Sequence, residues 1–101
     1  MAIDFFCHSS LLVNEAQEII DLLKMRHRGL FYSRFIFYDA GMESEVGKEI
    51  SLEYGLHAVS EFMISLNDKS SADLCPTVLS IVKCAFGVDN IVITSDGGAL
   101  R

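Results

Sequence analysis

The chain has 101 residues, with eight Lys and Arg against 14 Asp and Glu, and a formal charge of −6. Half of the residues are hydrophobic, so we predict one globular domain over residues 1–101, and the composition excludes a disordered chain. The acidic balance argues against direct binding of nucleic acid, and the apolar runs are too short to span a membrane. We therefore expect a cytoplasmic protein.

Residues 2–7 are predicted to form a short strand that alternates apolar and polar positions. A helix follows, for which Asn14 is the predicted N-cap and Gly29 is placed to cap the C-terminal end. Acidic residues come early in this helix and basic residues late, as the helix dipole favours. Its apolar stripe contains Ala16, Ile19, Ile20, Leu23 and His27.

The segment from 30 to 38 is predicted to be a strand that is apolar on both faces. Three of its aromatic residues, Phe31, Phe35 and Phe37, share one parity. If helices cover one side of the sheet, we expect these aromatic side chains on the open side. There they would form a face for a homodimer or for a partner, because a monomer of this size rarely exposes such a patch.

Residues 43–54 fit two structures. Residues 50–56 alternate between apolar and polar, which is typical of a half-exposed strand. Val46, Ile50 and Tyr54 are also spaced by four, which is typical of a helix. Because glycines within and after the segment disfavour a helix, we prefer the strand.

The next segment, residues 58–66, returns to helical spacing and is predicted to be a second helix, followed by a polar loop over 67–73. The apolar positions that carry this prediction are Ala58, Val59, Phe62, Met63 and Leu66.

A further helix is predicted to start at Asp73 as the cap, with Pro76 in the first turn, where a missing N–H costs nothing. Gly87 is predicted to end it. Residues 91–93 then form a short buried strand, and residues 97–101 a flexible tail.

The predicted order is β-α-β-β-α-α-β. Two βα units around a central hairpin indicate an α+β fold with a ferredoxin-like antiparallel sheet and helices packed on one face.

Two positions offer thiol chemistry. Cys75 precedes Pro76 at a helix N-terminus, where the dipole would lower the pKa of the thiol. Cys7 and His8 lie at a strand end, but neighbouring strand residues point to opposite faces. The three cysteines lack CxxC spacing and the histidines are dispersed, so we predict no disulfide framework, no metal and no cofactor.

The acidic series contains Asp39, Glu43, Glu45, Glu49, Glu53 and Glu61. We predict that the first five bind a partner. If the segment is helical, Glu45, Glu49 and Glu53 form a single stripe, and as a strand Glu49 and Glu53 project to one side. Only Lys48 is near enough in sequence to neutralise them, so the patch repels itself until a cation or a basic partner approaches.

These observations favour a non-catalytic binding protein. The leading hypothesis is an inhibitor, immunity protein or adaptor that docks its acidic patch on a basic protein, such as a nucleic-acid-processing protein. The alternative is a homodimeric domain that binds a small ligand or has a regulatory role. A third hypothesis is a thiol enzyme that uses Cys75.

Overall fold

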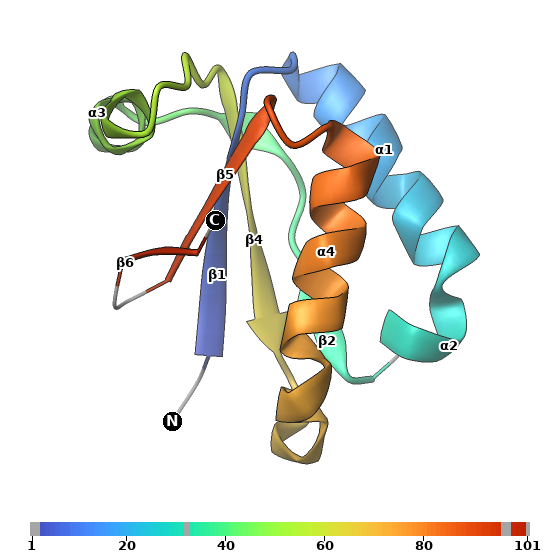
Figure 1. The fold of residues 1–101 in the computed structure, drawn as a ribbon. Helices are drawn as coiled ribbons and strands as arrows, with labels where there is room; N and C mark the ends of the chain where they lie inside the picture. The colour runs from blue at the N-terminus through green and yellow to red at the C-terminus, as the bar shows by residue number, and fades with distance from the viewer. Residues whose placement is uncertain (1–2, 32, 96–97, 101) are drawn as a thin grey trace.

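The computed structural model describes residues 3–31, 33–95 and 98–100, the last three by their backbone alone (Figure 1). Its strands are β1 (Ile3–Ser9), β2 (Phe35–Phe37), β3 (Gly41–Met42), β4 (Ser60–Leu66), β5 (Ile91–Ser95) and β6 (Gly98–Leu100). Its helices are α1 (Val13–Arg26), α2 (Arg28–Phe31), α3 (Glu45–Glu53), the 3-10 helix η1 (Lys69–Leu74) and α4 (Cys75–Phe86).

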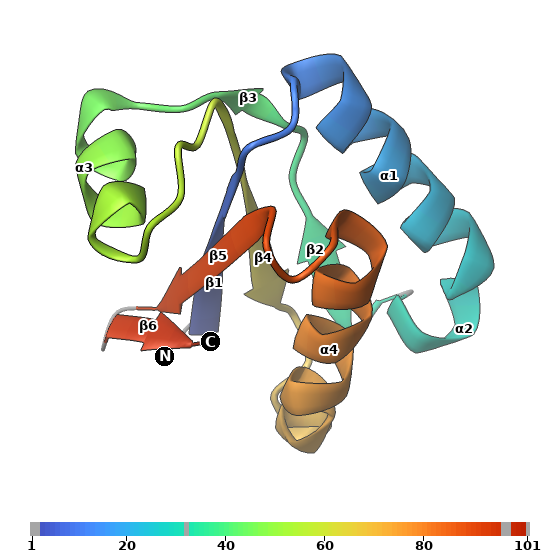
Figure 2. The ribbon, with the colours of Figure 1, turned by 45° about the horizontal axis from the view of Figure 1, so that its top comes forward.

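The described strands form one antiparallel sheet in the order β2-β4-β1-β5-β6, with β3 paired to β4 as well. α1 and α4 lie side by side on one face of this sheet, whereas α3 lies on the opposite side at one end (Figures 1 and 2). The predicted α+β class with an antiparallel sheet is therefore confirmed. The prediction that every helix packs on one face is wrong for α3. The ferredoxin-like order is not confirmed, because two elements differ from the predicted ones.

The main core lies between the sheet and the pair α1 and α4. Alternate residues of the strands point into it, which leaves the next residue of each strand on the opposite face. Phe62 of β4 stacks on Phe86 of α4 with ring centroids 5.3 Å apart. The helices contribute Ala16, Ile20, Leu23, Val78, Val82 and Phe86, and the central strands contribute Phe5, Cys7, Phe62, Ile64, Ile91 and Ile93.

The preferred strand at 43–54 is wrong, because residues 45–53 form α3. Ser44 caps this helix, and its side-chain oxygen accepts a hydrogen bond from the backbone N–H of Gly47 at 3.0 Å. The buried residues of this helix are Gly47 and Ser51, which are spaced by four. Neither is a large apolar residue, so a search for alternating apolar residues does not reveal the buried face of the helix. Gly47, which disfavours a helix by propensity, leaves room for the Glu43 side chain.

The predicted helix at 58–66 is also wrong, because residues 60–66 form β4. Ser60, Phe62, Ile64 and Leu66 are all buried on the same parity. β4 lies in the middle of the sheet and pairs with β1, β2 and β3, which supplies long-range hydrogen bonds that a local pattern does not reveal.

Phe31, Phe35 and Phe37 belong to the core, so the prediction that they lie on the open face of the sheet is wrong. Each is at most 7% exposed. Phe31 lies in α2 rather than in a strand, and its ring lies 4.7 Å from that of Phe37 and 6.5 Å from that of Phe35. The predicted homodimer loses this support and stays a prediction.

The ends of several elements differ from the predicted ends. α1 begins after Leu12, whose backbone N–H donates to Glu15 Oε1 at 3.0 Å, so Asn14 is not its cap. α1 ends at Arg26, and Gly29 lies inside α2. Pro76 in the first turn of α4 and Gly87 at its end are confirmed.

Within the tail predicted over 97–101, residues 98–100 pair with β5, and the flexibility of the tail stays a prediction. Residues 97 and 101 lie outside the described residues. The polar loop predicted at 67–73 contains η1, which Asp68 caps: its carboxylate accepts from the Ser70 N–H at 3.1 Å. The predicted Asp73 cap of α4 is wrong, because Leu74 occupies the N-cap position and makes no side-chain capping bond.

Candidate functional site

The outer face of α3 carries a stripe of three glutamates. Glu45, Glu49 and Glu53 are spaced by four, so they lie on one side of the helix, and all three are exposed. Lys48 approaches Glu45 to 3.6 Å, and both side chains are largely in solvent. The helical alternative for this segment predicted this stripe, which we call the acidic stripe.

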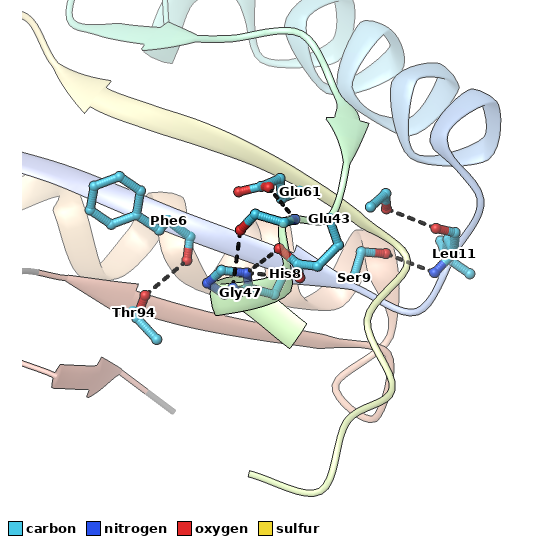
Figure 3. Close-up of polar contacts among 10 residues, drawn as sticks. Phe6, His8, Ser9, Leu11, Glu43, Gly47, Glu61 and Thr94 are labelled. Atoms are coloured by element: carbon cyan, nitrogen blue, oxygen red, sulfur yellow. Dashed lines mark hydrogen bonds and ion pairs between the residues drawn. The ribbon is translucent and has the colours of Figure 1, made fainter. Parts of the chain in front are cut away.

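Glu43, just before α3, is tied to the sheet by a buried pair. His8 of β1 lies on the sheet face opposite the core, and its Nδ1 is 2.9 Å from both carboxylate oxygens of Glu43 (Figure 3). The two side chains are 5% and 0% exposed. Burial raises the pKa of the Glu43 carboxyl, and the charge of Glu61 adds to this, while the hydrogen bond and the charge of His8 oppose it.

Gly47 makes room for this carboxylate. A Cβ atom at position 47 would overlap Oε1 of Glu43, so no other residue fits here without moving the pair. The first turn of α3 therefore packs directly over the His8–Glu43 pair (Figure 3).

Glu61 of β4 completes the arrangement. It lies directly across from His8 in the β1–β4 register, and its Oε1 accepts a hydrogen bond from the Ser44 N–H at 2.8 Å. Two strands and the turn before α3 thus meet at one point through His8, Glu43 and Glu61 (Figure 3).

The structure brings together only part of the predicted partner-binding set. Glu45, Glu49 and Glu53 share a surface. Glu43 does not belong to it, and its predicted place in an exposed patch is wrong because its side chain is fully buried. Asp39 lies beside α1, where its Oδ1 accepts from Gln17 Nε2 at 3.4 Å.

Sequence reasoning missed the pairing of His8 with Glu43. The two residues are 35 positions apart, and no local pattern connects them. One signal was present: His8 follows Cys7, a core residue on a strand, so its side chain had to face the other side of the sheet.

Comparisons with known proteins agree over nearly the whole chain. Residues 1–99 match the family model described as CDI System Immunity Component. The chain is 38% identical over 96 residues to Immunity protein CdiI-2 of Burkholderia pseudomallei strain 1026b, with 95% of each chain covered. The solved CdiA-CT/CdiI toxin and immunity complex from Burkholderia pseudomallei contains a similar chain, with a TM-score of 0.89 and 36% identity over 95% of this chain and 93% of that one.

The chain belongs to the family of CDI system immunity components. The hypothesis of an inhibitor or immunity protein is therefore confirmed at the level of the family.

Two of the three thiols of this immunity component have raised pKa values. Burial raises the pKa of Cys75, and the charge of Asp73 raises it further, so the predicted lowering at the helix N-terminus is wrong in direction. Cys7 is completely buried in the core, and burial strongly raises its pKa. Cys84 is the exposed thiol among the three.

A shallow pocket of about 370 Å³ lies at the end of α1, and the three core phenylalanines line part of it. Its other lining residues are Lys24, Met25, Arg28 and Ser33.

Over the described ranges, no helix has the length and apolar character needed to cross a bilayer.

Two glycine substitutions are expected to differ in their effect on stability. Gly47→Ala should lower the free energy of unfolding by about 1–3 kcal/mol, because the new methyl group displaces Glu43. Gly29→Ala in α2 meets no atom within 4 Å and should be neutral or stabilising, by up to about 1 kcal/mol. Urea unfolding of both variants measures this, and equal effects at the two positions would refute the packing role of Gly47.

Thiol labelling tests the enzyme hypothesis. At neutral pH, DTNB should modify the exposed Cys84 first, Cys75 more slowly, and Cys7 only after unfolding. Single Cys→Ser variants assign each kinetic phase. A Cys75 that reacts faster than free cysteine would contradict the raised pKa and revive the thiol hypothesis.

Proposed function

We propose that this immunity component neutralises a toxin domain similar to CdiA-CT by binding it through the outer face of α3. The observation that carries the proposal is the acidic stripe, which is exposed and neutralised only in part by Lys48. The similar chain of known structure was solved together with a CdiA-CT toxin, which supports a protein target. The structural match supports a shared fold with that chain. The proposal about α3 rests on the residues of this chain.

The stripe is unfavourable for the isolated protein. Like charges four residues apart destabilise a helix by about 0.2–0.5 kcal/mol per pair, and the stripe contains two such pairs. Glu53 also lies in the last turn, where the helix dipole favours a positive charge and no basic residue is present. A cationic surface on a partner would relieve both effects, so we infer that the partner is basic.

Apolar side chains flank the stripe. Val46 and Leu52 of α3 are 66% and 49% exposed, and Met42 before the helix is 82% exposed. Stable interfaces combine an apolar centre with a charged rim, and charged rims mainly accelerate association and set specificity. The surface of α3 offers both kinds of residue.

The proposed mode of action is occlusion. A nucleic-acid-processing toxin presents a basic surface to its substrate, and an acidic helix would occupy that surface in place of the phosphates. Inhibition would then be stoichiometric and would need no catalysis by the immunity component. We place this action in the cytoplasm, which the free cysteines favour.

Neutralising the stripe is expected to weaken binding. The triple variant Glu45→Gln, Glu49→Gln and Glu53→Gln should bind the cognate toxin domain, first identified by capture with the tagged chain, roughly 10- to 100-fold more weakly, mostly through slower association. The dependence of affinity on salt should also become shallower. Surface plasmon resonance at several salt concentrations measures both effects.

A charge-matched control separates the stripe from net charge. Glu18→Gln, Asp73→Asn and Asp89→Asn remove three exposed acids outside α3 and should leave the affinity within about threefold. If both triple variants lost affinity equally, or if the α3 variant kept the affinity and salt slope of the original chain, the docking surface would lie elsewhere.

A further inference from the structure

Three metal-ligating side chains converge next to α3. His8 of β1, Glu43 before α3 and Glu61 of β4 each place one ligand atom so that all three atoms lie within 4.8 Å of one another (Figure 3). Each comes from a different element, so the fold rather than local sequence brings them together. One imidazole and two carboxylates are a donor set that Zn²⁺ and similar divalent ions accept.

Of the residues that the structure describes, His8 alone faces the two carboxylates of this cluster as a possible positive charge. Glu43 is fully buried and Glu61 is partly buried, and within the described ranges neither forms an ion pair with a lysine or arginine. His8 is the one group of the cluster that can carry positive charge. Two carboxylates at such close range, one of them buried, repel each other, and a bound cation would relieve this repulsion.

The imidazole is incompletely bonded. Nδ1 of His8 contacts Glu43, but Nε2 is buried and has no hydrogen-bond partner among the residues that the structure describes. Buried polar atoms of native proteins almost always have a partner, so the unpartnered Nε2, on the same ring as the Nδ1 that faces the carboxylates, is a sign that this imidazole lacks a ligand. The partial exposure of Glu61 leaves the cluster open to solvent on one side.

We propose that His8, Glu43 and Glu61 form a binding site for a divalent transition-metal ion, with Zn²⁺ as the best fit to the donors. Three protein ligands leave a coordination position for water. The bound ion would join β1, β4 and the turn that starts α3, so it would hold the helix that carries the acidic stripe. The site itself does not depend on the identity of the toxin.

The test uses the folded chain alone. After treatment with a chelator and its removal, the protein is titrated with ZnSO₄ by isothermal titration calorimetry. We expect one equivalent of Zn²⁺ to bind with a dissociation constant in the micromolar range or below, and the melting temperature to rise when Zn²⁺ is added.

Matched variants locate the site. Glu61→Gln changes a partly exposed ligand, so it is expected to stay folded by circular dichroism and to lose at least 10-fold in affinity for Zn²⁺. Glu49→Gln on the outer face of α3 should bind Zn²⁺ as the original chain does. Cys84→Ser should do the same, because the exposed thiol is the main competing ligand.

The proposal fails on any of three results. These are binding of less than half an equivalent by the original chain, unchanged affinity in Glu61→Gln, or loss of binding in Cys84→Ser. None of them affects docking through the acidic stripe, which is measured separately with the toxin domain.

Discussion

The contact between His8 and Glu43 joins the sheet to α3, and the position of the acidic surface depends on it. Both side chains are almost completely buried, so the pair is held without solvent screening. Removing one partner of such a buried, hydrogen-bonded pair typically costs about 1–3 kcal/mol or more, because the other polar group is left buried and unsatisfied. Gly47 and Ser44 serve the same contact, the first by leaving space for the carboxylate and the second by starting the helix beside it.

This anchoring explains how an unfavourable surface persists. α3 is a nine-residue helix with like charges along one side and an acid in its last turn, which is a poor design for an isolated helix. The buried pair and the cap hold its first turn, while Leu56 and Ala58 pack with Val92 in a second small core beyond its end. These contacts thus offset the destabilising effect of the like charges on the outer face of α3. The residues of that face can therefore serve binding rather than the stability of the helix.

The sequence predicted the parts of the fold whose signals are local. The amphipathic stripe of α1, the Pro76 start and Gly87 end of α4, and the strand at 91–93 each follow from a few neighbouring residues. The local pattern of β4 predicts a helix, because the hydrogen bonds that make it a strand come from three strands distant in sequence. The local pattern of α3 predicts a strand, because Gly47 disfavours a helix and its role, to leave room for Glu43, appears only in the tertiary structure. The acids of the stripe were identified from composition and spacing, whereas the His8–Glu43 pair needed the tertiary structure.

Hydrogen–deuterium exchange of this chain, free and bound to its cognate toxin domain, tests docking through α3 most directly. We predict that binding slows exchange of the backbone amides of residues 45–53, with little change in α1 and α4, which cover the opposite face of the sheet. Protection confined to α1 and α4, with α3 exchanging as it does in the free protein, would contradict this mode of docking.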